Sequence, residues 1–187
     1  KYDVIIIGAG IVGLATGLKI LEKKPGLKLL IVEKEKDIAM HQTGNNSGVI
    51  HAGVYYKPGS LKALNCTTGY RMLLDFCDRE SIKYELCGKL IVATGQDELP
   101  RLENLYQRAL QNGLDKVIKI KAEEIKNYEP YATGISAIYV PYTGIIDYRE
   151  VSAKYAEIIQ EKYNGEIKLL HKVADIRKNS DGAEVIT

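Results

Sequence analysis

Short apolar runs alternate with amphipathic stretches along the chain, and the first three predict one compact unit. Residues 2–7 (YDVIII) have the pattern of a buried β-strand, and residues 13–24 carry a helical pattern that Pro25 and Gly26 end. Residues 27–33 (LKLLIVE) form a second apolar strand. A strand, a helix and a strand of this size are typical of a βαβ unit with parallel strands.

The middle of the chain predicts two helices and three strands. Ser60 is a plausible N-cap for a helix over 60–79, and the second helix has its apolar positions at Leu102, Leu105, Tyr106, Ala109 and Leu110. The predicted strands are 90–94 (LIVAT), 117–120 (VIKI) and 137–140 (AIYV).

The last forty residues predict a helix, a strand and a hairpin. Asp147 and Glu150 have the spacing of a capping box, and the helix that follows has inward positions at Val151, Tyr155, Ile158 and Ile159. A strand at 166–170 and a turn at Ser180-Asp181-Gly182 come next. Because residues 183–187 begin the return strand of that hairpin, we expect the polypeptide to be a truncated piece, inactive by itself.

Composition excludes several classes of protein. The 187 residues carry 26 basic and 24 acidic side chains for a net charge of +2, and these charges are interspersed, so the chain lacks the basic patch of a nucleic-acid-binding protein. Cys66, Cys77 and Cys87 show no Cys-x-x-Cys spacing and lie in apolar contexts. We therefore expect reduced, buried thiols, no metal site and a non-secreted protein.

The segment Gly8-Ala9-Gly10-Ile11-Val12-Gly13 has the spacing Gly-x-Gly-x-x-Gly between the first strand and the first helix. Gly8 permits the tight turn, Gly10 allows a pyrophosphate to approach the backbone, and Gly13 allows the helix to pack closely on the strand. The amides of the first helical turn, which include those of Ile11 and Val12, then face the phosphates. The segment predicts a dinucleotide site.

Glu33 ends the second strand, where a carboxylate can accept hydrogen bonds from a ribose diol. Its charge repels a 2′-phosphate, which leaves NAD or FAD. The polar, glycine-rich stretch 41–56 (HQTGNNSGVIHAGVYY) favours FAD, because a nicotinamide enzyme would usually continue into further βα units here. Residues 43–48 could line the path of FAD, which would bring residues 51–56 near the flavin.

Three segments resemble one family of flavoproteins. Residues 32–63 (VEKEKDIAMHQTGNNSGVIHAGVYYKPGSLKA), 87–94 (CGKLIVAT) and 142–151 (YTGIIDYREV) are similar to the L-2-hydroxyglutarate dehydrogenase or oxidase family, within the D-amino-acid oxidase and glycerol-3-phosphate dehydrogenase superfamily. Asn45 departs from the larger basic or imidazole side chain expected there, so it receives no role.

The resemblance implies an α/β fold with a Rossmann-like FAD-binding βαβ domain and part of an inserted, β-rich substrate domain. Residues 1–85 and 147–187 would form the incomplete FAD-binding domain, and 86–146 part of the substrate domain. The implied activity is oxidation of L-2-hydroxyglutarate, a small dicarboxylate hydroxy acid, to 2-oxoglutarate. Electrons would pass through FAD to a quinone-linked acceptor or to oxygen. The expected location is intracellular, either the bacterial cytoplasm or inner membrane face, with possible peripheral membrane association, or the mitochondrion.

Site residues follow from the motifs and the resemblance together. His51 is the candidate catalytic base because an imidazole titrates near neutrality. His41 is its rival, and His171 is expected to be structural. A dicarboxylate needs cations or phenols at both ends, and His51, Tyr55, Lys57 and Lys89 are the candidate substrate contacts. The predicted cofactor contacts are Gly8, Gly10, Ile11, Val12, Gly13, Glu33, Lys34, Thr43, Asn46, Ser47, Gly48 and Val49.

Two alternatives to this function remain open. A related flavoprotein could oxidise an amino acid or glycerol 3-phosphate, and a non-catalytic nucleotide-binding fragment would need no substrate pocket.

Overall fold

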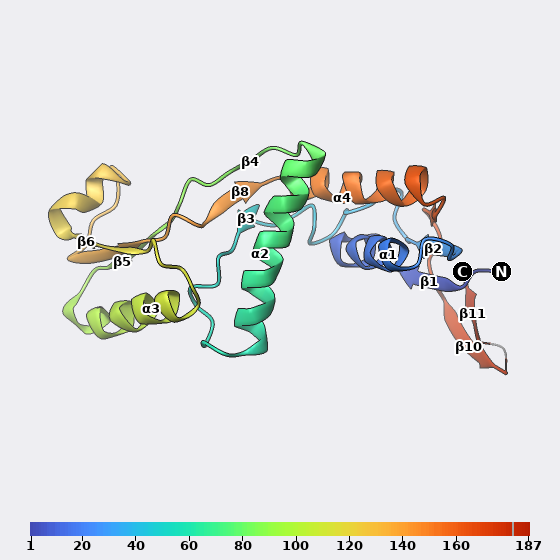
Figure 1. Cartoon of the computed structure of the whole chain (residues 1–187), viewed down its shortest axis with the longest axis horizontal. Helices are drawn as coiled ribbons and strands as arrows, with labels where there is room; N and C mark the ends of the chain where they lie inside the picture. Colours follow the sequence, from blue (N-terminus) through green and yellow to red (C-terminus); the bar gives the residue numbers. More distant parts are fainter. Residues whose placement is uncertain (181) are drawn as a thin grey trace. The chain divides into compact units, whose positions relative to one another are not determined.

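The structure is a computed structural model that describes residues 1–180 and 182–187. The chain forms two compact units (Figure 1). Unit 1 combines Lys1–Ser47 with Asp147–Thr187, and unit 2 is Gly48–Ile146. The chain therefore leaves unit 1 once and returns to it once.

Unit 1 is built on a parallel sheet with the strand order β1-β2-β9. The strands are β1 (Val4–Ile7), β2 (Leu29–Val32) and β9 (Glu166–Lys168). Helix α1 (Ile11–Lys23) connects β1 to β2, and the two strands pair in parallel from Val4 opposite Leu29 to Ile7 opposite Val32. The predicted βαβ unit is thus confirmed. β2 is buried along its whole length because it lies between two strands.

Helix α4 (Tyr148–Glu157) lies beside α1 in unit 1 (Figure 1), and a π-helix at Ile158–Lys162 continues it. Asp147 caps α4 by accepting a hydrogen bond from the amide of Arg149 at 2.8 Å. The predicted inward positions are Val151 and Ile159, which are buried, and Tyr155 and Ile158, which are partly buried. A Cβ at Gly17 would lie 3.2 Å from Ile31 Cδ1 and 3.4 Å from Ile6 Cδ1, so this glycine lets α1 approach the sheet closely.

A hairpin of β10 (Asp175–Asn179) and β11 (Gly182–Ile186) ends the described chain. The two strands pair antiparallel as the sequence predicts. Asp181, the middle residue of the predicted turn, lies outside the described residues.

Unit 2 contains two antiparallel three-stranded sheets. One has the order β3-β8-β4, with β3 (Val49–Ile50), β8 (Gly144–Ile146) and β4 (Tyr84–Glu85). The other has the order β5-β7-β6, with β5 (Leu90–Ala93), β7 (Ser136–Tyr139) and β6 (Ile118–Lys121). The helices are α2 (Leu61–Glu80), α3 (Leu99–Gln111) and two 3₁₀ helices at Gln96–Glu98 and Ala122–Asn127.

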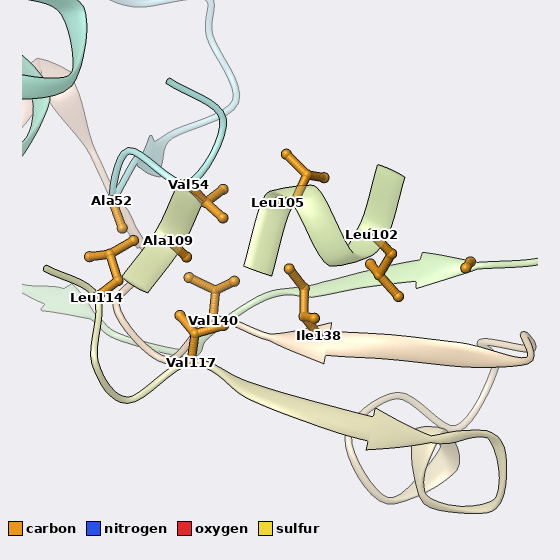
Figure 2. Packing of buried hydrophobic residues seen from close by; sticks show 10 residues of the cluster. Ala52, Val54, Leu102, Leu105, Ala109, Leu114, Val117, Ile138 and Val140 are labelled. Atoms are coloured by element: carbon orange, nitrogen blue, oxygen red, sulfur yellow. The ribbon is translucent and has the colours of Figure 1, made fainter. Parts of the chain in front are cut away.

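The main core of unit 2 lies between α3 and the sheet that contains β5 and β7 (Figure 2). Its buried side chains are Ala52, Val54, Ala93, Leu102, Leu105, Ala109, Leu114, Val117, Ile138 and Val140. Ala52 and Val54 pack here against residues beyond 86, and this is why the compact units divide after Ser47 rather than at residue 85.

Two sequence predictions about burial are wrong. Leu110 is 37% exposed, because it lies near the end of α3 and off the face that carries Leu102, Leu105 and Ala109. Cys87 is exposed, because it leads into a turn at Gly88 and not into a strand, whereas Cys77 is buried and Cys66 is intermediate.

Candidate functional site

The glycine turn of unit 1 has the geometry that its sequence predicts. Gly8 has a φ of +102°, a left-handed conformation that favours glycine, and its amide donates to the carbonyl of Val32 at 2.8 Å. A Cβ at Gly13 would overlap the carbonyl oxygen of Gly8. The third glycine therefore allows α1 to start directly above the end of β1.

The first turn of α1 is left open toward an anion. Its N-cap residue, Gly10, has no side chain to accept a hydrogen bond, and the turn carries no acidic residue. Thr43, in the polar loop, lies beside the start of α1, and its Oγ1 accepts a hydrogen bond from the amide of Ile11 at 3.1 Å. The Thr43 hydroxyl can at the same time donate a hydrogen bond to another acceptor. Backbone amides with a donor hydroxyl beside them suit a phosphate group.

Glu33 lies next to the glycine turn, half-buried at the end of β2. Its Oε2 accepts from the amide of Ala9 at 2.7 Å, and its Oε1 accepts from the amide of Glu35 at 3.0 Å. These bonds fix the carboxylate beside the turn, and each oxygen has a second lone pair that can accept from a ribose hydroxyl.

A groove of about 320 Å³ brings these groups together. Five predicted cofactor contacts line it, namely Gly8, Gly10, Glu33, Lys34 and Thr43. Five residues that the sequence motifs did not indicate as cofactor contacts line the groove as well, namely Met40, His41, His171, Lys172 and Val173. The volume lies at the low end of the range for ligand sites.

His171 reaches the groove through backbone pairing. Its amide donates to the carbonyl of Glu33 at 2.8 Å, and the amide of Leu170 donates to the carbonyl of Glu35 at 2.9 Å. The ring Nδ1 of His171 lies 2.7 Å from the carbonyl oxygen of Leu169. Its structural role stays a prediction, and the residue lines the groove. The signal that could have found it is the parallel strand β9, which carries the following residues to the end of β2.

Charged side chains pair along one rim of the groove. His41 Nε2 lies 2.8 Å from Glu35 Oε1, and Lys34 Nζ lies 3.3 Å from the same oxygen. The hydrogen bond from His41, and then that from Lys34, lowers the pKa of the Glu35 carboxyl below its usual range. His41, the rival candidate base, is thus engaged by a carboxylate.

Two asparagines stabilise the polar loop at 39–47 through hydrogen bonds within the loop. Asn45 Nδ2 donates to the carbonyls of Met40 and His41, and Asn46 Nδ2 donates to those of Gln42 and Thr43. Asn46 was predicted as a cofactor contact, and these bonds give it a role in shaping the loop.

The remaining predicted cofactor contacts do not line the groove of unit 1. They are Ile11, Val12 and Gly13 in α1, Asn46 and Ser47 in the loop, and Gly48 and Val49 in unit 2. Ile11 takes part through its amide, and Gly48 has a φ of +66° where the chain turns into β3. Their contact with a cofactor stays a prediction.

The predicted catalytic and substrate residues all belong to unit 2. The His51 ring is exposed, and its carbonyl accepts from the thiol of Cys66 on α2 at 3.3 Å. Burial raises the pKa of that thiol, so it stays protonated and can donate. Lys57 is exposed, and its carbonyl accepts from Ser60, the N-cap of α2.

Tyr55 and Lys89, predicted separately, meet in the structure. Lys89 Nζ lies 4.5 Å from the centroid of the Tyr55 ring, within the range of a cation–π contact. Burial lowers the pKa of the Lys89 ammonium from its usual value. A half-buried ammonium on an aromatic face is a suitable partner for a carboxylate.

Sequence reasoning missed two arginines near Tyr55. A surface pocket of about 540 Å³ is lined by Tyr55, Pro100, Arg101, Asn104, Leu105 and Arg108. Arg108 Nη1 donates to the carbonyl of Tyr55 at 3.3 Å, and Asn112 Nδ2 donates to the carbonyls of Gly53 and Tyr56. Arg108 and Asn112, the C-cap residue of α3, are four residues apart and lie on one side of the helix. Their hydrogen bonds attach the segment 53–56 to this end of α3.

Within residues 1–180 and 182–187, no group of three or more His, Cys, Asp or Glu side chains is arranged to hold a metal ion. In the same described part of the chain, no helix is both long enough and apolar enough to cross a membrane.

Comparison with known proteins gives one family. The model of the family described as FAD dependent oxidoreductase (DAO) matches residues 3–187. The chain is 52% identical over 186 residues to the L-2-hydroxyglutarate dehydrogenase of Indibacter alkaliphilus, covering 100% of this chain and 46% of that protein. It is 49% identical over 176 residues to the mitochondrial L-2-hydroxyglutarate dehydrogenase of Bos taurus, covering 94% of this chain and 38% of that protein. The chain thus spans less than half the length of these curated relatives.

Solved structures agree with the sequence comparison. Dithionite reduced L-alpha-glycerophosphate oxidase from Mycoplasma pneumoniae with FAD bound is similar at a TM-score of 0.88 and 28% identity, covering 98% of this chain and 49% of that one. Glycine oxidase from Geobacillus kaustophilus has a TM-score of 0.86 at 21% identity, with 98% of this chain and 50% of that one covered. These likenesses confirm the α/β fold class. The family model and the curated relatives confirm the family resemblance predicted from the sequence.

Proposed function

The chain belongs to the DAO family of FAD dependent oxidoreductases, and we propose that it forms part of an enzyme that oxidises L-2-hydroxyglutarate to 2-oxoglutarate. Family membership agrees with the FAD predicted from the sequence. The substrate is supported by relatives named L-2-hydroxyglutarate dehydrogenase at 52% and 49% identity.

The observation that carries the proposal is the groove of unit 1. Gly10 and the first turn of α1 would hold the pyrophosphate of FAD, with the Thr43 hydroxyl as a further donor. Glu33 would accept hydrogen bonds from the ribose of the adenosine half. The donor and acceptor types match the groups they would meet, so the residues present fit this cofactor. Bound FAD supplies the hydride acceptor for the reaction.

Oxidation of a secondary alcohol also requires that the hydroxyl proton leaves. We propose that the exposed imidazole of His51 accepts this proton, since a neutral imidazole has a ring nitrogen that can act as a general base. Cys66 would keep the backbone of His51 in place through its thiol hydrogen bond. Tyr55, Lys57 and Lys89 would contact the carboxylates, and the Lys89 ammonium on the Tyr55 ring is the best organised of these groups.

Unit 1 would then be the core of the FAD-binding domain, and residues 86–146 part of the substrate domain. The electron acceptor, a quinone or oxygen, and peripheral membrane association are part of the same proposal. So is the location, in the bacterial cytoplasm or at the inner membrane face, or in the mitochondrion. The mitochondrial names of several relatives support the last of these for those proteins.

A second candidate is oxidation of glycerol 3-phosphate or an amino acid. It is favoured by the similarity to a glycerophosphate oxidase at 28% identity. The higher identity to the dehydrogenases of L-2-hydroxyglutarate makes this the weaker candidate.

The deciding experiment is anaerobic reduction of the complete FAD-bound enzyme of which this chain forms part. L-2-Hydroxyglutarate should bleach the flavin absorption, whereas glycerol 3-phosphate and glycine should not. His51→Ala should retain FAD and slow the bleaching by about 10²- to 10⁴-fold, because it removes a general base.

Bleaching by glycerol 3-phosphate or glycine alone would replace the proposed substrate. FAD that is bound but reduced by none of the three compounds would favour the non-catalytic alternative. A His51→Ala rate within a few fold of the parent would assign His51 to structure.

A further inference from the structure

The loop at 39–47 has to stay against the start of α1 if Thr43 is to serve the cofactor groove. Two contacts with the glycine-turn region hold it there. The amide of Ala39 donates to the carbonyl of Ala9 at 3.1 Å, and the amide of Ile11 donates to Thr43 Oγ1 at 3.1 Å. The asparagine bonds described above act within the loop and do not attach it to the rest of unit 1.

A third contact comes from the distant segment of unit 1. Arg149, in the first turn of α4, donates from Nη2 to the carbonyl of Gly44 at 2.7 Å. This bond joins residues 105 positions apart. The guanidinium is charged, so this hydrogen bond is charge-assisted, and it lies at an exposed site.

Gly44 is shaped to receive this guanidinium. A Cβ there would lie 2.7 Å from Arg149 Nε and would overlap the carbonyl oxygen of Ala39. The missing side chain therefore lets the guanidinium lie directly on the loop backbone. The φ of Gly44 is not in the left-handed region, so other residues could adopt its backbone conformation. A glycine is needed here because there is no space for a side chain.

The α4 end of the contact is also fixed. Asp147 accepts from the amide of Arg149 at 2.8 Å, which holds the first turn of α4. Among residues 1–180 and 182–187, the Arg149 guanidinium forms no ion pair within 4.0 Å that would compete for it. Its charge is directed to the loop carbonyl.

We propose that Arg149 is a positioning residue for the cofactor: by holding the Gly44 carbonyl, it keeps Thr43 against the first amide of α1 before FAD binds. This inference rests on the proposed FAD function. Arg149 acts through the loop and has no assigned contact with the cofactor itself.

The test measures FAD affinity by flavin fluorescence and loop order by hydrogen exchange in the absence of FAD. Arg149→Met should weaken FAD binding by about 3- to 10-fold, since a hydrogen bond from a charged group at an exposed site is lost. It should also speed exchange at the amides of residues 43–46. Gly44→Ala should act in the same direction, because its methyl group displaces the guanidinium. Arg149→Lys should recover part of the affinity.

Arg79→Met is the matched control, since Arg79 is an exposed arginine paired with Glu80 in unit 2. It should leave both FAD affinity and loop exchange unchanged. FAD affinity of Arg149→Met within twofold of the parent, measured well below its unfolding temperature, would overturn the proposal.

Failure of the parent protein to bind FAD would contradict the proposed function instead. In that case, the exchange rates still decide the role of Arg149. Faster exchange at residues 43–46 in Arg149→Met would support its hold on the loop, and unchanged exchange would overturn it.

Discussion

Glu33 organises the glycine turn before a cofactor binds, because its carboxylate accepts from the amides of Ala9 and Glu35. Thr43 does the same at the start of α1 through the amide of Ile11. Gly10 lines the same groove, and its missing side chain leaves space beside Thr43. At the scale of single residues, the site thus combines two fixed polar groups with one position that must stay empty.

Gly10→Val tests the empty position. The φ of Gly10 is −75°, which any residue adopts, so the backbone should fold normally. A Cβ there would lie 3.4 Å from Thr43 Oγ1, and valine adds two further methyl groups at a residue that lines the groove. FAD affinity should fall roughly 10- to 100-fold, in line with a few kcal/mol of overpacking.

Gly26→Val is the control for Gly10→Val, because a Cβ at Gly26 meets no atom within 4 Å and the residue lies outside the groove. It should bind FAD like the parent. If Gly10→Val binds FAD as tightly as the parent, the pyrophosphate does not lie at this turn.

The pKa of Lys89 should lie below its usual value of 10.5, because burial disfavours the charged form. Between the lowered pKa and 10.5, the unfolded state holds more protons than the folded state, so stability should rise with pH in that window. Lys89→Met removes this charge. Its free energy of unfolding should exceed that of the parent most near neutral pH, and the difference should shrink as the pH rises through the pKa of Lys89.

Urea unfolding of the parent and Lys89→Met at several pH values measures this difference. If the difference in free energy of unfolding between Lys89→Met and the parent stays constant, or grows toward alkaline pH, burial of the Lys89 ammonium does not destabilise the folded state.

At the scale of elements, the close approach of α1 to β1 is what shapes the turn. Gly13 allows it, since any side chain there would overlap the Gly8 carbonyl. Gly13→Ala should therefore cost about 1–3 kcal/mol of stability by overpacking. Gly69→Ala in α2 is the matched control, because its Cβ would meet nothing within 4 Å and should instead stabilise the helix by about 0.5–1 kcal/mol.

Chemical denaturation of the two alanine variants checks the comparison. Equal effects at positions 13 and 69 would mean that helix propensity alone decides both, and that the packing of α1 on β1 is looser than described.

The elements also show where sequence reasoning succeeds. The turn at Gly8, the helix after it and the acidic end of β2 were predicted because each has a local signal within a few residues. Strands β3 and β4 were missed, because two residues are too short for a periodic pattern. The predicted burial of Leu110 was wrong, because burial of a residue in α3 depends on which elements pack against that face of the helix.

At the scale of the whole molecule, the cofactor groove draws on both segments of unit 1. Gly8 to Thr43 come from the first segment, whereas His171, Lys172 and Val173 come from the second. Sequence reasoning could not place the second group, because backbone pairing between residues 33–35 and 170–171 joins positions more than a hundred residues apart. Arg149 was missed for the same reason.

FAD bound in the groove of unit 1 should protect the backbone that lines it, so hydrogen exchange is measured with and without saturating FAD. Bound FAD should slow exchange at the amides of residues 9–13 and 33–44, where the glycine turn, Glu33 and Thr43 line the groove. Unchanged exchange at these amides with FAD bound, or protection confined to unit 2, would contradict the account.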